Sequence, residues 1–333
     1  MKNIFTSQNA LLLAAMLLLG SCSDKQDTAP SIASIAVHNP DFQILEDAAV
    51  RGGVAGTLSN KNPNDPSGNY TVFAPTNAAF ARLGLRSAAD LNGLQQSFLT
   101  STLLYHVFSG NLLGSNLTAG TTSASVLQDA SKTAITRRVI ERQGVRYING
   151  SRLLATDVPA ANGTVHPIDK VLLATGVDIV QSAIALKDAK VFVTPELSFL
   201  VEAVLYAELA PDFTASPGSP ALTVFAPTDQ AFRELGTLLG VPLNVPADIR
   251  RLPKTTVQAV LLNHVVPGGQ FTPEMPENSA VKTAGGGSLQ LGPFLNGTLT
   301  VQGKGNTMPA SMVIPDVQCT NGTVHVINKV LLP

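Results

Sequence analysis

The spacing of apolar positions predicts a strand followed by a helix in the first part of the chain. Residues 70–74 form a run of aromatic and β-branched residues behind an Asn- and Pro-rich stretch, which is typical of a strand. Thr76 or Asn77 can cap the helix that follows. Phe80 and Leu83 share one face of that helix, so we expect both to face a core.

This element and a second block occur twice, in the same order. The sequence TVFAPT stands at 71–76 and again at 223–228, and NGTVH stands at 162–166 and again at 321–325. Each NGTVH copy is followed shortly by KVLL. A unit this long is a whole domain rather than a solenoid repeat of roughly 20–50 residues. The chain therefore contains two copies of one domain.

Between the two blocks, each domain has a second amphipathic helix that carries a histidine. The spacing i, i+3, i+4, i+7 places His106 and His264 on the inward face. Tyr105 and Asn263 are rotated from them by about 100° and are expected nearer the edge of that face. We expect Tyr105 to be the more exposed, and the glycines a few residues further on to end both helices.

The last third of each domain is predicted to be rich in strands. Asn149-Gly150 between two apolar runs predicts a hairpin over 145–154. Residues 164–173 and 323–332 are nearly continuous apolar runs, typical of strands buried on both faces. Pro167 has no N–H, so we expect that stretch to lie at a sheet edge or a bulge.

The first residues resemble a bacterial lipoprotein signal. An apolar run at 10–19 is too short to span a membrane, and small residues and Cys22 follow it. The resemblance implies a signal peptide over 1–21, a lipid on Cys22 and a polar tether over 22–31. It implies an exported protein anchored to the outer membrane or cell surface. An ordinary signal peptide with an incidental cysteine is the alternative, and Thr28 stands in a stretch that resembles a Bacteroidetes O-glycosylation site.

The composition excludes some classes of protein. The net charge is −1, charged residues make up 14% of the chain, and no basic block is present, which argues against a nucleic-acid partner. Trp is absent and Tyr occurs four times, so a lectin with aromatic platforms is disfavoured. Cys319 is the one cysteine besides Cys22, so no internal disulfide is expected if Cys22 is lipidated.

The repeated blocks resemble the two signatures of the fasciclin-like domain. The first signature is similar to TVFAPTxxAF and the second to NGxxHxIDKVL, and both are present in each copy, with Asn328 in place of Asp169. Between them the family carries a Tyr-His or Asn-His pair, here Tyr105-His106 and Asn263-His264.

The resemblance covers about residues 32–333. It implies an α+β fold of two tandem fasciclin-like domains, at 32–173 and 177–333. Each is expected to be a β-wedge or sandwich with several helices packed at one end. The joint between them is short, so we expect the domains to touch. The resemblance also implies a role in cell adhesion or attachment to extracellular matrix.

Four of the five histidines pair across the two copies, and we expect them to be structural. Zinc binding is the alternative, because imidazole is a zinc ligand. The two histidines of a copy are far apart in sequence, however, and copy one has no cysteine or Glu-x-x-His cluster beside them. No metal or cofactor is therefore expected. The four are His106, His166, His264 and His325.

No catalytic set can be assembled from the sequence. A hydrolase triad that uses His106 and Asp169 would need a nucleophilic serine, and no Gly-x-Ser-x-Gly elbow lies near either histidine of that copy. Asn328 replaces Asp169 in copy two, so a catalytic carboxylate would serve one domain only. Cys319 has no electropositive neighbour in sequence and is expected to be a small buried or turn residue. We expect no enzymatic activity.

Candidate contact residues come from the resemblance. In animal members, the Tyr-His region and an Asp-Ile pair are linked to integrin binding. This chain has Tyr105, with Asn263 in copy two, and carries Ile168 and Asp169 in the opposite order. The leading prediction is a non-enzymatic, lipid-anchored surface protein that acts through protein–protein or protein–glycan contacts. The alternative is an accessory binding lipoprotein of an outer-membrane polysaccharide-uptake system, with an apolar pocket on the order of several hundred Å³ between the domains.

Overall fold

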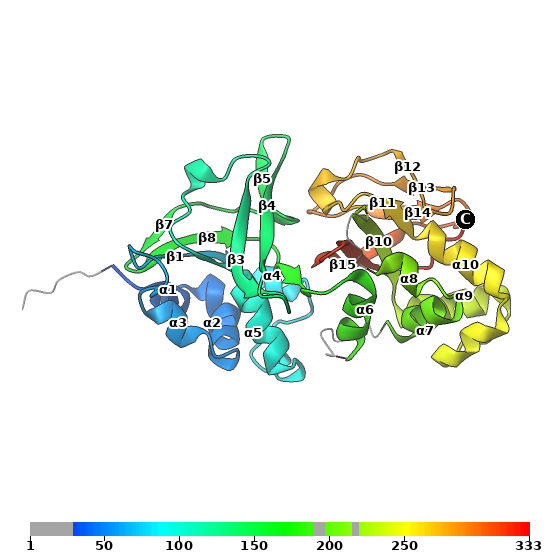
Figure 1. Ribbon diagram of the computed structural model, residues 1–333, viewed down its shortest axis with the longest axis horizontal. Coiled ribbons are helices and arrows are strands. Elements are labelled where there is room, and N and C mark those ends of the chain that lie inside the picture. The colour runs from blue at the N-terminus through cyan, green and yellow to red at the C-terminus, as the bar shows by residue number, and fades with distance from the viewer. Residues whose placement is uncertain (1–28, 189–196, 215–219) are drawn as a thin grey trace, which may run out of the picture.

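The computed structural model describes residues 29–188, 197–214 and 220–333. Cys22, Thr28 and the predicted signal peptide lie outside the described residues. Figure 1 shows two domains side by side, each with helices on one side and strands on the other. The predicted α+β architecture of two tandem domains is confirmed.

The helices of each domain pack together at one end (Figure 1). The first domain contains α1 (Ile32–His38), α2 (Gln43–Arg51), α3 (Ala55–Ser59), α4 (Asn77–Ala81) and α5 (Gln96–Tyr105). The second contains α6 (Ile179–Asp188), α7 (Ser198–Tyr206), α8 (Ala210–Phe213), α9 (Asp229–Leu239) and α10 (Lys254–Asn263). Short 3-10 helices are η1 (Pro40–Phe42), η2 (Asp90–Gly93), η3 (Gly114–Asn116), η4 (Pro246–Arg251) and η5 (Thr272–Glu274).

The strands of the first domain form two four-stranded sheets. The first has the order β2 (Val107–Ser109), β1 (Tyr70–Pro75), β8 (Gly163–Ile168), β7 (Val158–Ala160). The second has the order β3 (Thr122–Gln128), β4 (Ala134–Arg142), β5 (Val145–Ile148), β6 (Ser151–Arg152). The predicted hairpin on Asn149-Gly150 is confirmed, because it joins β5 to β6.

In the second domain the strands form one eight-stranded sheet. Its order is β11 (Val265–Pro267), β10 (Leu222–Pro227), β16 (Gly322–Ile327), β15 (Ala310–Cys319), β14 (Thr300–Gly303), β13 (Ser288–Leu291), β12 (Ala280–Lys282). The remaining strand, β9 (Leu173–Ala174), comes from the end of the first domain and pairs in parallel with β15. The two domains therefore touch, as the short joint predicts.

The two signature blocks of each copy lie side by side in the sheet. β1 pairs in parallel with β8, and β10 pairs with β16 in the same register. Glycine is needed where this pairing begins, because a Cβ on Gly163 would lie 1.8 Å from the carbonyl oxygen of Tyr70. In the second domain, a Cβ on Gly322 would lie 2.0 Å from the carbonyl oxygen of Leu222. The blocks recur together because each is the packing partner of the other.

The asparagine before each of these glycines ties the last strand to the first helix of its domain. Oδ1 of Asn162 accepts from the N–H of Ile32 at 2.9 Å, where α1 begins. Oδ1 of Asn321 accepts from the N–H of Ile179 at 2.9 Å, where α6 begins. Of the two residues that the sequence offers as a cap for α4, the structure uses Thr76 rather than Asn77.

Two local predictions are wrong. Helix α5 ends at Tyr105 rather than at Gly110, because the chain turns at His106 into β2, which pairs with β1. Helix α10 ends early for the same reason. Pro167 does not lie at a sheet edge, since β8 lies between β1 and β7. It is tolerated there because the pairing with β7 stops at Val165.

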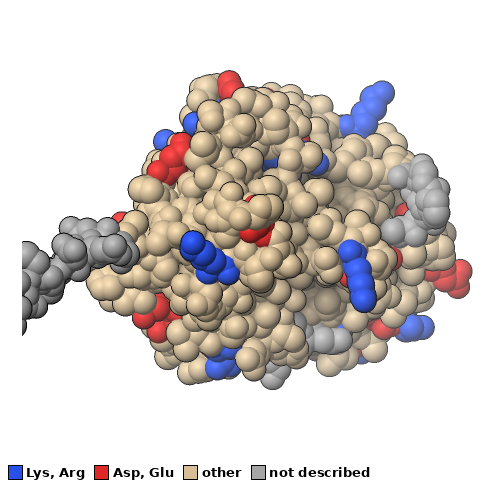
Figure 2. All heavy atoms as spheres, turned by 60° about the vertical axis from the view of Figure 1, so that its left-hand side comes forward, with Lys and Arg blue, Asp and Glu red and all other residues tan. Residues whose placement is uncertain are grey.

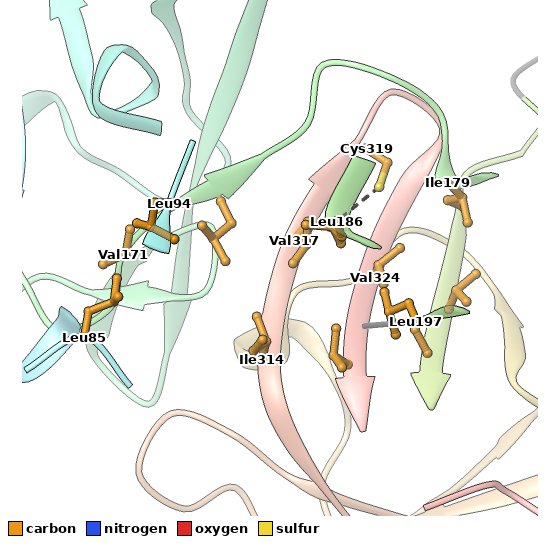
Figure 3. Packing of buried hydrophobic residues seen from close by; sticks show 14 of the residues in the cluster. Leu85, Leu94, Val171, Ile179, Leu186, Leu197, Ile314, Val317, Cys319 and Val324 are labelled. Atoms are coloured by element: carbon orange, nitrogen blue, oxygen red, sulfur yellow. Dashed lines mark hydrogen bonds between the residues drawn. The ribbon is translucent and has the colours of Figure 1, made fainter. Parts of the chain in front are cut away.

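Buried residues of both domains form one hydrophobic cluster (Figure 3). Val171 and Leu85 contribute from the first domain, and Ile314 and Val317 contribute from β15 of the second. The strand of the first NGTVH block is buried along almost its whole length, as predicted, but it ends at Ile168 rather than at Leu173, and its counterpart ends at Ile327 rather than at Leu332. A core that continues across the boundary makes the two domains one packed body.

Candidate functional site

The first paired histidine of each domain bonds the end of a helix to a segment near the end of the domain. Nδ1 of His106 donates to the carbonyl of Thr102 at 2.7 Å, and Nε2 accepts from the N–H of Leu172 at 2.9 Å. His264 makes the equivalent backbone bonds at 2.7 and 2.8 Å. Burial lowers the pKa of both rings to about 4, so both are neutral at neutral pH. Neither ring has a nitrogen left for a metal.

The second paired histidine of each domain uses the opposite tautomer. Nε2 of His166 donates to the carbonyl of Leu112 at 2.8 Å, and Nδ1 accepts from the N–H of Asp157 at 3.1 Å. His325 makes the same two bonds with the backbone of its own domain, at 3.0 and 3.1 Å. Burial lowers the pKa of both rings. The geometry supports a structural role for all four histidines.

The exposure predicted for Tyr105 is wrong, because the side chain is 0% exposed. Its hydroxyl donates to Oε1 of Gln318, a residue of the second domain, and accepts from Nδ2 of Asn149 at 2.7 Å. Gln318 also donates to the carbonyl of Thr136 at 2.9 Å. Tyr105 therefore joins the two domains and is out of reach of an external partner.

Two further candidate contact residues are buried. Asn263 is 1% exposed, and its Nδ2 donates to the carbonyl of Leu331 at 3.2 Å inside the second domain. Ile168 is 0% exposed in β8. Ile168 lies in a strand that is buried on both faces, and Asn263 lies on the buried face of α10. A surface contact through either side chain is not compatible with this geometry.

Asp169 is the candidate contact residue that reaches solvent, with a side chain 18% exposed. Its Oδ1 accepts from the N–H of Arg152 at 2.8 Å, and its Oδ2 lies 3.6 Å from a terminal nitrogen of Arg82. One carboxylate oxygen is therefore held by the backbone and the other faces a loosely held guanidinium. A binding role for Asp169 stays a prediction.

The residue after Asp169 forms a buried ion pair with the second domain. Nζ of Lys170 lies 2.8 Å from Oδ2 of Asp316, and the two side chains are 9% and 8% exposed. Nζ also donates to the hydroxyl of Thr272 at 3.2 Å and to the carbonyl of Gly297. Burial alone would raise the pKa of Asp316, but Lys170 and the other surrounding groups lower it below its usual value.

Two arginines of β4 bind a segment of the second domain. Nε of Arg138 donates to Glu274 at 2.8 Å, and Arg142 lies 3.0 Å from the carboxylate of Glu277. Each guanidinium also lies over a phenylalanine ring of the second domain, at 4.6 and 4.5 Å from the ring centroid. Charge pairs and cation–π contacts together fix the relative orientation of the domains.

The sequence predicts that the domains touch but not which residues join them. Lys170 and Lys329 occupy the same position of the repeat, and Lys170 alone of the two faces the other domain. One signal was available: Asp157 and Asp316 both stand nine residues before the second histidine. Their φ angles are 63° and 67°, a conformation that non-glycine residues adopt rarely. A repeated aspartate of this kind indicates a structural requirement.

Within the described ranges, no group of three or more His, Cys, Asp or Glu side chains could hold a metal ion. Cys319 is buried, and burial raises the pKa of its thiol to about 11, so it carries little thiolate at neutral pH. Figure 3 places it beside Val317 on β15, whose carbonyl it faces. None of the described helices has the length and apolar character needed to cross a membrane.

The structure defines a protein of two tandem domains, each with the same pair of signature strands. The polar residues that recur in both domains stabilise the fold. Residues 40–174 and 195–333 both match the Fasciclin domain, and the chain belongs to the fasciclin domain family. The family and the tandem arrangement that the sequence predicts are confirmed.

Relatives of the chain occur in animals and in bacteria. It is 29% identical over 267 residues to transforming growth factor-beta-induced protein ig-h3 of Sus scrofa, which covers 80% of this chain and 35% of that protein. It is 34% identical over 147 residues to cell surface glycolipoprotein MPB83 of Mycobacterium bovis, covering 43% and 60%. The chain thus spans about a third of the length of ig-h3.

A solved structure is also similar to the chain. It is a FAS1 domain pair from the insect cell adhesion molecule Fasciclin I. The sequence identity is 17% and the TM-score is 0.36, over 90% of this chain and 96% of the other.

Proposed function

We propose that this protein is a non-enzymatic cell-surface binding protein, anchored by a lipid on Cys22, that acts through protein–protein or protein–glycan contacts. The observation that carries the proposal is that the repeated histidines bond to the backbone of their own domains. Each of the four paired histidines has both ring nitrogens bonded to backbone groups. The groups most suited to chemistry are thus committed to holding the fold. What remains for function is the surface of a rigid domain pair.

The surface supports contact with a largely uncharged partner. Figure 2 shows scattered Lys, Arg, Asp and Glu side chains separated by broad uncharged areas. Long-range steering of a polyanion needs a field of one sign, which a net charge of −1 does not provide. Family membership supports adhesion, and the relationship to a cell surface glycolipoprotein supports the surface location and the lipid.

The test compares a deletion strain with strains that express the parent chain or Cys22→Ala at equal levels. We expect deletion to lower attachment to protein- or glycan-coated surfaces, and the parent chain to restore it. Cys22→Ala should not restore it, because the unacylated protein lacks its anchor. Attachment that does not change on deletion would refute the adhesive role. Attachment fully restored by Cys22→Ala would refute the lipid anchor instead.

The alternative role in polysaccharide uptake needs a pocket that can hold a sugar chain. The described residues include a cavity between the domains of about 210 Å³. Ligand pockets for drug-sized molecules measure roughly 300–1,000 Å³. The cavity is small for an oligosaccharide, and this favours adhesion over the alternative.

A further inference from the structure

The cavity between the domains is built from both of them. One side is formed by α4 and by the segment that leads into β9, and the other side by β15 with Thr298. Its volume of about 210 Å³ is many times the roughly 10–15 Å³ that a single water molecule needs. A site of this size fits a small molecule and would not exist in either domain alone.

The inner wall of this cavity is apolar. Val171 and Leu173 line it from the first domain and Met312 from the second, and all three side chains are buried. Two lining residues reach solvent: the side chain of Arg82 is 41% exposed and Val313 is 39% exposed. They define the mouth of the cavity. The cavity therefore combines an apolar interior with a cation at its entrance.

The guanidinium of Arg82 has donors to spare. One terminal nitrogen donates to the carbonyl of Asn296 at 2.8 Å, and the other lies 3.6 Å from Asp169, beyond good hydrogen-bond distance. A guanidinium carries five N–H donors, and its fork matches a carboxylate in a bidentate pair. Lys170, the other cation of the wall, is already committed to Asp316. Arg82 is thus the group that can receive an anion.

The positive charge of Arg82 occurs only in the copy of the repeat that lies at the junction between the domains. Glu234 occupies the position of Arg82 in the second copy, where it pairs with Lys329 at 3.8 Å. The fold therefore does not require a cation at this position, because the equivalent site carries the opposite charge. The arginine occurs in the copy whose helix α4 faces the other domain.

We propose that the cavity between the domains binds a small amphipathic carboxylate. The carboxylate pairs with Arg82 at the mouth, and an alkyl or aryl tail fills the apolar interior. This site is independent of the adhesive role, and either can fail without the other.

The test is calorimetric titration of the full two-domain chain with sodium octanoate in detergent-free buffer. We expect one saturable site, with binding to Arg82→Gln weaker by about 10- to 100-fold, because a hydrogen-bonded ion pair is lost. The matched control is Arg86→Gln, which removes an exposed arginine that does not line the cavity and should bind octanoate like the parent. Butyrate should bind at least 10-fold more weakly than octanoate, since its tail leaves much of the interior empty.

A second variant tests the apolar wall. Met312→Glu places a negative charge in the cavity and should abolish octanoate binding, and its circular dichroism spectrum reports whether it has folded. Octanoate that does not bind the parent, or that binds Arg82→Gln as tightly as the parent, would overturn the proposal. Equal affinities for butyrate and octanoate would overturn it as well, because the tail would then lie outside the cavity.

Discussion

The ammonium of Lys170 lies 2.8 Å from the carboxylate of Asp316, and the two residues belong to different domains. The carboxylate of Asp316 also accepts from the N–H of Thr272 at 2.7 Å. The second domain therefore orients this carboxylate, and Lys170 of the first domain binds it. Lys329 occupies the same position of the repeat and meets Glu234 at the surface at 3.8 Å. One copy of the repeated lysine thus links the two domains, and the other does not.

Lys170→Met should lower the free energy of unfolding by about 3 kcal/mol, because it leaves the buried Asp316 without its cation. Lys329→Met is the matched control and should cost less than about 1 kcal/mol, since its pair is exposed. Urea denaturation of both variants measures the difference. Equal losses would show that Lys170 does not act through a buried pair.

Gly150→Ala should separate the domains. A Cβ at this position would lie 1.9 Å from Oδ2 of Asp316 across the interface, too close to be relieved without moving the turn or the second domain. We expect small-angle X-ray scattering to show a larger radius of gyration and proteases to cut faster near 174–176. Gly93→Ala, where the added Cβ meets nothing within 4 Å, should leave both unchanged. A compact, protease-resistant Gly150→Ala would contradict the predicted role of the turn.

Tyr105→Phe should lower stability by about 1 kcal/mol without altering attachment to a partner. The variant loses the hydroxyl that bonds Gln318 and Asn149, and it keeps the buried ring. A double-mutant cycle with Gln318→Ala should show coupling, because both changes remove the same bond. Lost attachment at unchanged stability would instead restore Tyr105 as a contact residue.

The stability should fall with pH below about 6.5. An unfolded histidine has a pKa near 6.5, whereas burial lowers the pKa of His106 and of His264 to about 4. The unfolded chain then binds more protons between these values, so each ring contributes its full stability above about pH 6.5 and loses it as pH falls toward 4. The loss is on the order of 3 kcal/mol per ring by pH 4.

Unfolding measured from pH 7.5 to 4.5 tests this dependence. His106→Gln should reduce its slope, and His38→Gln, a change at an exposed histidine, should leave it intact. A parent-like slope in His106→Gln would show that other groups cause the dependence.

Cys22 should carry the lipid. Cells labelled with an alkyne fatty acid should incorporate it into the parent chain and into Cys319→Ala, but not into Cys22→Ala. Cys319 is the appropriate control because it is buried and its thiol pKa is raised. Label that persists in Cys22→Ala would place the lipid elsewhere or exclude it.

The sequence could predict what is local or repeated. The strand at 70–74, a helix cap at Thr76 or Asn77 and the hairpin on Asn149-Gly150 follow from side-chain pattern and turn chemistry, and the structure contains all three, with the cap at Thr76. The burial of Tyr105 could not be predicted, since it depends on Gln318, which is distant in the chain and lies in the other domain. The early end of α5 likewise depends on the pairing of β2 with β1.

The candidate site shows the same division. The prediction of a structural role for the histidines follows from their position on a buried face and a buried strand. The alternative hypothesis predicts an apolar pocket between the domains, but the residues that line it, Arg82 among them, could not be predicted, because α4 and β15 are brought together only when the domains dock.

Strand β9 belongs by sequence to the first domain and by hydrogen bonding to the sheet of the second. The mechanical connection between the domains is therefore broader than the few residues that join them. A force that pulls the chain at its two ends would load this parallel strand pair and the ion pair beside it before the connecting peptide could extend. The tandem should consequently transmit tension as one stiff unit, with no hinge at its centre.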